Sequence, residues 1–130
     1  MKRVAARIGD WTPPQHECHA NVHKWVEHSP KDRIVRGWLY FDFLGAFEWV
    51  KFTSHSVIET ETGELIDITP SQASTTYPFI RHEGTDEEFT RLVERSDHGD
   101  IKHYRPAEQP WLRGVAEQVL REARSRGLKV

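Results

Sequence analysis

The feature that most constrains the fold is a pair of strand-like segments joined by a turn that contains glycine. Residues 47–60 and 65–69 are rich in β-branched and aromatic side chains, as strands are. The loop between them, residues 61–63, ends on glycine and fits a type I turn followed by a left-handed residue. This three-residue loop pairs Thr60 with Glu64, and the register of the whole hairpin follows from that pair.

The predicted register decides which side chains share one face of the hairpin. Counting back from the turn pairs Val57 with Asp67 and His55 with Thr69. Because side chains alternate between the two faces of a strand, these four lie on one face, where His55 and Asp67 are diagonal neighbours. A carboxylate in that position can orient the imidazole. A slip of one residue would instead place the two side chains on opposite faces.

The chain contains a single cysteine, which excludes an internal disulfide and is typical of proteins in reducing compartments. Cys18 begins a predicted helix over residues 18–28, in which the apolar residues recur on one face. The N–H groups and the dipole at a helix N-terminus favour a thiolate, and hence a nucleophile. Cys18 also belongs to the apolar face, so a buried structural cysteine is the alternative.

One run of residues resembles a known family. The run is His55-Ser56-Val57-Ile58-Glu59, followed by Gly63 and Asp67-Ile68-Thr69. It is similar to the pattern of the transglutaminase-like superfamily of papain-like enzymes, in which a cysteine at a helix start precedes a histidine and an aspartate on successive strands. The resemblance spans about residues 15–70. It departs from the family at Val57, where many members carry tryptophan, and at His19, where an aromatic residue commonly follows the cysteine.

The resemblance implies a Cys-His-Asp triad that transfers an acyl group from a peptide or protein amide through a thioester. In this triad Cys18 is the nucleophile, His55 is the general base and then the acid, and Asp67 holds the imidazole tautomer. The backbone N–H of Cys18 is the first candidate for an oxyanion hole, and Gln15 and Trp11 are the side-chain candidates. Such chemistry needs neither a metal nor an organic cofactor. Protease, amidase, deamidase and cross-linking activities all stay open.

Two other functions stay open beside the enzyme. The same fold with an unreactive thiol would be a protein-binding module. Such a module is recognised by a thiol pKa of about 8.5, the ordinary value for a free cysteine. A metal-binding protein is the third reading, because His19 and His23 are four residues apart on the predicted helix and can meet one ion. The chain has no second cysteine and no HExxH order, so our prediction for the triad site includes no metal.

The remaining segments predict an α+β fold in one domain over residues 1–130, with helices packed on an antiparallel sheet. The N-terminal helix precedes the strands, and further helices end the chain, which is also the papain-like arrangement that the resemblance implies. Residues 1–15 and 101–108 are predicted to be irregular. The other predicted strands cover residues 34–40 and 75–81, the second at an edge because of Pro78, and the other helices cover residues 85–95 and 110–126.

Charge and hydropathy restrict the partners and the location. Eighteen Lys and Arg against twenty Asp and Glu give a net charge of −2, which argues against nucleic acid as the partner. No apolar run approaches the roughly 18 residues that span a bilayer. The basic N-terminus also lacks the apolar stretch of a secretory signal. We therefore expect a cytoplasmic protein with no membrane contact. The oligomeric state stays open.

Overall fold

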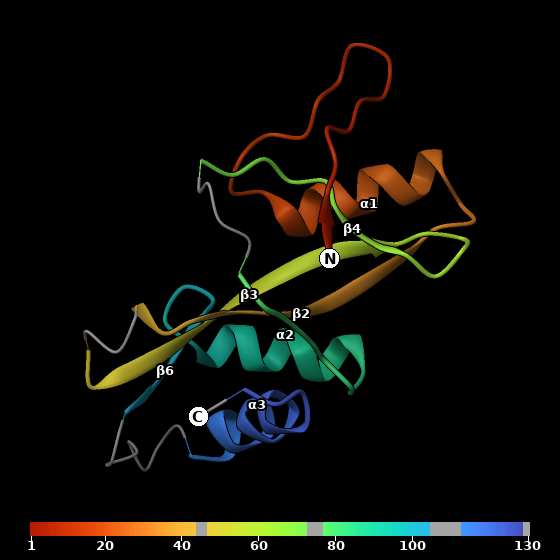
Figure 1. The fold of residues 1–130 in the computed structure, drawn as a ribbon. Coiled ribbons are helices and arrows are strands. Elements are labelled where there is room, and N and C mark those ends of the chain that lie inside the picture. The colour runs from red at the N-terminus through yellow and green to blue at the C-terminus, as the bar shows by residue number, and fades with distance from the viewer. Residues whose placement is uncertain (44–46, 73–76, 105–112, 129–130) are drawn as a thin grey trace. The chain divides into compact units, whose positions relative to one another are not determined.

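The computed structural model describes residues 1–43, 47–72, 77–104 and 113–128 (Figure 1). Helices and strands are mixed along the chain, in agreement with the predicted α+β class. No helix in the described ranges combines the length and apolar character needed to cross a membrane. The elements are β1 (Lys2–Arg3), α1 (Cys18–His28), β2 (Arg33–Phe41), β3 (Trp49–Glu59), β4 (Leu65–Asp67), β5 (Phe79–Arg81), α2 (Asp86–Arg95), β6 (Asp100–Tyr104) and α3 (Arg113–Ser125).

The strands of the described residues form one sheet in the order β1-β4-β3-β2-β5, with β6 also paired to β3. Strand β3 runs antiparallel to β4 and β6, and β2 runs antiparallel to β5. Strand β1 runs parallel to β4, which corrects the prediction of a purely antiparallel sheet. The chain divides into two compact units, one of Met1–Arg36 with His55–Thr76 and one of Gly37–Ser54 with Tyr77–Val130.

In the first unit, the hairpin of β3 and β4 has the predicted register. Ile58 lies opposite Ile66, which continues the register of a pair between Thr60 and Glu64. The backbone N–H of Thr60 donates to the carbonyl oxygen of Glu64 at 2.8 Å. Gly63 has φ +87°, a left-handed conformation that costs a glycine little. Local turn chemistry therefore determines which side chains face the first unit's core.

Helix α1 covers the predicted residues, and its apolar face packs into the core of the first unit. Val22 is fully buried, and burial of a valine side chain stabilises a fold by about 1.5 kcal/mol or more. Trp25 and Val26 pack at the margin of the cluster. The indole N–H of Trp25 donates to Oδ2 of Asp32 at 2.9 Å, so its polar edge is satisfied. The buried members of this core are Ala6, Val22, Ile58, Ile66 and Ile68.

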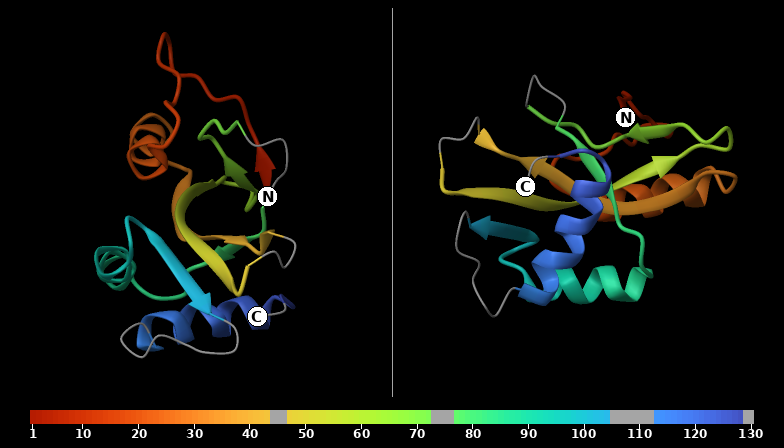
Figure 2. Two further views of the ribbon diagram at one scale, coloured as in Figure 1. Left: turned by 90° about the vertical axis from the view of Figure 1, so that its left-hand side faces the viewer. Right: turned by 60° about the horizontal axis from the view of Figure 1, so that its bottom comes forward.

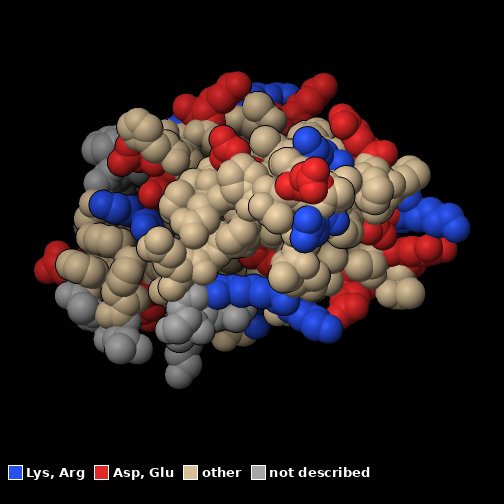
Figure 3. Space-filling model, turned by 90° about the horizontal axis from the view of Figure 1, so that it is seen from above, with Lys and Arg blue, Asp and Glu red and all other residues tan. Residues whose placement is uncertain are grey.

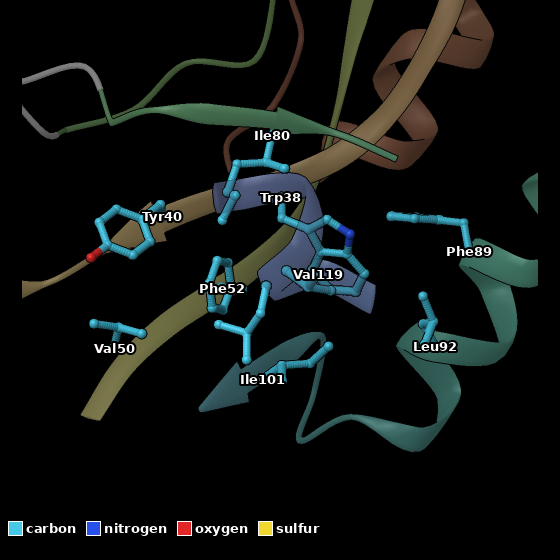
Figure 4. Close-up of a cluster of buried hydrophobic side chains, with 11 residues drawn as sticks. Trp38, Tyr40, Val50, Phe52, Ile80, Phe89, Leu92, Ile101 and Val119 are labelled. Carbon is cyan, nitrogen blue, oxygen red and sulfur yellow. The ribbon is translucent and has the colours of Figure 1, made fainter. Parts of the chain in front are cut away.

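The second unit has its own core, in which side chains from β2, β3, β5 and β6 meet α2 and α3 (Figure 4). Trp38 is fully buried at the centre, and its ring lies 5.3 Å from that of Phe89, centroid to centroid. The predicted apolar positions Val119 and Leu120 of α3 are buried in it. The buried members are Trp38, Tyr40, Val50, Phe52, Ile80, Phe89, Leu92, Ile101, Val119, Leu120 and Ala123.

The predicted ends of several elements are confirmed. Oγ1 of Thr85 accepts the N–H of Glu88 at 3.1 Å and caps α2. Gly127, at φ +82°, follows the end of α3. Strand β5 lies at an edge of the sheet, as Pro78 predicts. Parts of three predicted segments lie outside the described residues, namely residues 75–76, 105–108 and 110–112, which include Trp111.

Two segments predicted to be irregular each contain a strand within their described residues. Strand β6 occupies the start of 101–108, where Ile101 and His103 are buried and alternate with partly exposed neighbours. A histidine at an inward position conceals the period-two pattern, because histidine counts as polar. Strand β1 consists of two exposed basic residues and is held by pairing to β4, so no apolar pattern marks it.

Glu122 of α3 makes the stability of the second unit depend on pH. Its side chain is buried, Oε1 accepts the N–H of Glu83 at 3.1 Å, and Oε2 has no hydrogen-bond partner among the described residues. Burial raises the pKa of Glu122 from 4.5 to about 7. A carboxyl whose pKa is raised on folding stabilises the fold fully below its unfolded pKa, and that contribution is lost as the pH rises through about 7.

We therefore expect Glu122→Gln to stabilise the protein at pH 8 and to leave its stability nearly unchanged at pH 5. A gain of about 1 kcal/mol corresponds to a rise in melting temperature of roughly 2–8 °C for a chain of this size. Calorimetry at the two pH values measures this rise. Glu117→Gln, at an exposed position of the same helix, is the matched control. An equal rise at both pH values would contradict the assignment.

Candidate active site

Cys18 is the first residue of α1 and is partly exposed. The first helical hydrogen bond runs from the N–H of Asn21 to the carbonyl oxygen of Glu17 at 2.8 Å. The N–H groups of the first turn therefore have no acceptor within the helix and point beyond its N-terminus, toward the side where an anion is favoured. This is the position that the sequence predicts for the thiol.

The segment before Cys18 is a long loop that leaves β1 and returns to α1 (Figure 2). His16 has φ +63°, a left-handed conformation that costs a residue with a side chain about 1–2 kcal/mol. Asn21 anchors the end of this loop. Its buried amide donates to the carbonyl oxygen of Pro14 at 2.9 Å and to Oγ1 of Thr69 at 3.0 Å. Asn21 thus fixes the approach to the thiol, a role that its place in the sequence alone does not indicate.

His55 and Asp67 form a buried hydrogen-bonded pair on the predicted face of the hairpin. Nε2 of His55 lies 2.8 Å from Oδ2 of Asp67, and both side chains are almost inaccessible to solvent. Oδ1 of Asp67 accepts the backbone N–H of Thr69 at 3.2 Å, which holds the carboxylate in place. Because an ionised carboxylate only accepts, the proton of this hydrogen bond sits on Nε2 of His55. Nδ1 of His55 is then the nitrogen available to the thiol.

The Cys18 thiol hydrogen-bonds to two imidazoles, those of His55 and His19. Burial raises the pKa of the thiol, but the hydrogen bonds from His19 and His55, followed by the charge of the His55 imidazolium, lower it to about 6. Burial lowers the pKa of His55, but its hydrogen bonds to Asp67 and Cys18 and their charges raise it to about 9. Between these values the thiolate faces an imidazolium, which is the reactive form of such a pair.

His19 and His23 contact different partners. Nδ1 of His19 lies 2.5 Å from Oγ of Ser56, and Nε2 of His23 accepts from the guanidinium of Arg36 at 2.9 Å. That guanidinium occupies the lone pair that a metal ion would need. In the part of the chain that the structure describes, no three His, Cys, Asp or Glu side chains are grouped so as to hold a metal ion.

The two side-chain candidates for the oxyanion hole lie before α1. Gln15 is exposed in the turn that leads to the helix. Trp11 is partly buried, its backbone N–H donates to Ile8 at 2.9 Å, and Lys24 lies 5.0 Å above the centre of its ring. An oxyanion role for either side chain stays a prediction. Basic and acidic side chains are interspersed on the face shown in Figure 3, without a broad region of one sign.

The arrangement combines the parts that nucleophilic catalysis requires. A partly exposed thiol at a helix N-terminus contacts an imidazole, and a buried carboxylate orients that imidazole. Hydrogen-bond donors on the backbone lie beside the thiol. The chain matches no known protein family, no curated protein and no solved structure.

Proposed function

We propose that this protein is a cysteine-dependent amide hydrolase or acyltransferase with a transglutaminase-like, papain-like core. The observation that carries the proposal is the chain of contacts from the Cys18 thiol to the His55 imidazole and on to Asp67, with 2.8 Å between Nε2 and Oδ2. A peptide or protein amide is the substrate class that suits a partly exposed thiolate. The resemblance of residues 15–70 to that superfamily supports the same reading.

The reaction begins with attack of the Cys18 thiolate on the carbonyl carbon of the amide. A carbon–sulfur bond forms, the carbonyl electron pair moves to oxygen, and the backbone N–H of Cys18 stabilises the oxyanion. When the oxyanion collapses, the carbon–nitrogen bond breaks, and the leaving amine takes the proton that the His55 imidazolium donates. A thioester and a neutral imidazole remain.

The second half of the reaction regenerates the thiolate. Neutral His55 accepts a proton from water, or from an acceptor amine, as this nucleophile attacks the thioester carbonyl. Collapse of the second oxyanion expels the thiolate and restores the ion pair with the imidazolium. The proton on Nε2 of His55 stays hydrogen-bonded to Asp67 throughout, so that Nδ1 of His55 faces the reacting atoms in both steps.

The first test uses the rate at which iodoacetamide alkylates Cys18 as a function of pH. Because the chain has one cysteine, the signal reports this thiol alone. Since only the thiolate reacts, we expect the rate to rise with a midpoint near the pKa of about 6. A midpoint of about 8.5, the pKa of an unperturbed thiol, would contradict the proposal and favour the binding module.

Acyl transfer is tested with p-nitrophenyl acetate as a generic acyl donor. We expect a burst of nitrophenolate, an acetyl thioester on Cys18 detected by mass spectrometry, and slow hydrolysis of this thioester. Cys18→Ser is the control that should lack both the burst and the adduct. If Cys18 becomes acetylated but the thioester is never hydrolysed, the cysteine is reactive but the second half of the reaction does not occur.

A further inference from the structure

The thiol contacts two imidazoles, and only one of them belongs to the predicted triad. Nδ1 of His19 points to Ser56, at 2.5 Å from Oγ, so we assign the hydrogen bond between His19 and the thiol to Nε2. Which nitrogen carries the His19 proton therefore decides whether the ring donates to the sulfur or presents a lone pair to it.

Arg36 settles the direction of the hydrogen bond between Ser56 and His19. Its Nη1 donates to Oγ of Ser56 at 2.7 Å, and a guanidinium cannot accept. The Ser56 hydroxyl must therefore accept from Arg36 and donate its own proton elsewhere. Ser56 is fully buried, and within the described residues its contact besides Arg36 is Nδ1 of His19. The reverse direction would leave a buried hydroxyl proton without an acceptor, which is costly.

Nδ1 of His19 thus accepts the hydrogen bond from Ser56, and the proton of the ring sits on Nε2. Arg36 is itself held by a second contact, since its Nη2 donates to Nε2 of His23 at 2.9 Å. Two charged groups connect to this network: Arg36 through Ser56, and the pair of His55 and Asp67 through the thiol. The chain of donors runs from Arg36 through Ser56 to His19 and ends at the sulfur.

We propose that His19 is a second catalytic histidine, whose Nε2–H donates to the Cys18 sulfur, and that Ser56 and Arg36 are positioning residues that fix its tautomer. This inference rests on the proposed function and adds a role to it. His55 gives up its proton to the leaving amine, whereas His19 keeps its proton. His19 therefore stabilises the sulfur as an anion both when it attacks and when it leaves.

The tautomer can be measured without any substitution. In a protein labelled with ¹³C and ¹⁵N, two-bond correlations between ring protons and nitrogens distinguish an Nε2–H ring from an Nδ1–H ring, and through-bond correlations from the backbone to the ring assign the signals to His19. We expect the Nε2–H pattern for His19 in the intact protein. Ser56→Ala removes the donor to Nδ1 and should give a mixture of tautomers. An Nδ1–H pattern in the intact protein would overturn the proposal.

The effect on the sulfur is measured by the pH midpoint of alkylation. His19→Phe keeps a ring but removes the donor, and we expect the midpoint to rise by about one pH unit, as loss of a hydrogen bond to a charged group implies. His19→Gln, whose amide can donate, should recover part of the shift. Ser56→Ala should raise the midpoint less than His19→Phe does. His28→Phe, at an exposed position of α1, is the control.

The outcomes separate this inference from the proposed function. If His19→Phe leaves the midpoint unchanged while His55→Gln raises it, the second histidine is refuted and the triad stands. If neither substitution moves the midpoint, the proposed function fails as well. Because the tautomer measurement uses the intact protein, it decides the inference even if a substitution prevents folding.

Discussion

Replacing His55 by glutamine should raise the midpoint of Cys18 alkylation from about pH 6 to above pH 8. The imidazolium supplies both a hydrogen bond and a positive charge to the sulfur, and these oppose the burial that raises the pKa of the thiol. Glutamine carries no positive charge, so burial then dominates, and the thiol becomes protonated at neutral pH. Turnover of p-nitrophenyl acetate should fall further, because the general base and acid of both half-reactions is lost, a loss of about 10²–10⁴-fold by itself.

A matched control separates this effect from a general change of charge. His28 lies on the same helix as Cys18 but is exposed near its C-terminal end, so His28→Gln should leave both the midpoint and the turnover unchanged. Thermal unfolding of each variant shows whether the fold is intact. An unshifted midpoint in folded His55→Gln would show that the imidazole does not stabilise the thiolate, and the triad would be refuted.

The hairpin and the first helix could be predicted because their signals are local. A loop that ends on Gly63 sets the register over a few residues, and the register alone places His55 and Asp67 on one face. The apolar face of α1 is likewise visible within eleven residues, and Cys18 begins the helix as predicted. The pairing of histidine with aspartate then follows from strand geometry without knowledge of the rest of the chain.

The parts of the site that the sequence did not indicate depend on contacts between distant elements. Ser56 on β3 contacts His19 on α1, and Arg36 on β2 contacts Ser56, through side-chain hydrogen bonds that no periodicity encodes. The sequence instead suggested His19 as a metal ligand together with His23, because a spacing of four residues is all that it shows. Strand β1 was missed for the same reason, since its pairing to β4 rests on backbone groups.

Hydrogen bonds of the surrounding residues fix the positions of the loop before Cys18 and of Asp67. Asn21 is buried and ties the loop before Cys18 to the end of the hairpin through Thr69. The backbone N–H of Thr69 also holds the carboxylate of Asp67. Thr69 thus links the loop before Cys18 to the carboxylate of Asp67. In the proposed reaction, a site supported in this way would need little reorganisation when charge develops.

Asp67→Asn should reduce turnover of p-nitrophenyl acetate by about 10³–10⁴-fold, the size of loss seen when a triad histidine takes the wrong tautomer. Asparagine has the shape of aspartate and can still accept the N–H of Thr69 through its oxygen. Its amide then faces Nε2 of His55 as a donor, and the imidazole proton must move to Nδ1. With a proton on Nδ1, neutral His55 cannot accept the proton of water in the second half-reaction.

The same substitution should change the upper limit of the pH range in which the ion pair exists. Asp67 raises the pKa of His55 through a hydrogen bond and through its charge, so the imidazolium persists up to about pH 9. The stabilisation that this raised pKa gives the fold is present at acid and neutral pH and is lost as the pH rises through about 9. In Asp67→Asn, His55 should lose its charge at a lower pH than in the intact protein. The difference in stability between the two proteins should therefore shrink above about pH 9.

Two measurements on Asp67→Asn decide whether Asp67 orients the His55 imidazole or only stabilises the fold around it. The pH profile of turnover should lose its alkaline portion, whereas a structural defect alone would reduce turnover equally at all pH values. Asp10→Asn, an exposed carboxylate in the same unit whose contact with Arg7 spans 3.8 Å, is the matched control and should change neither profile. A folded Asp67→Asn variant that keeps both its rate and its alkaline limit would show that His55 needs no orienting carboxylate, and Cys18 with His55 would then act as a dyad.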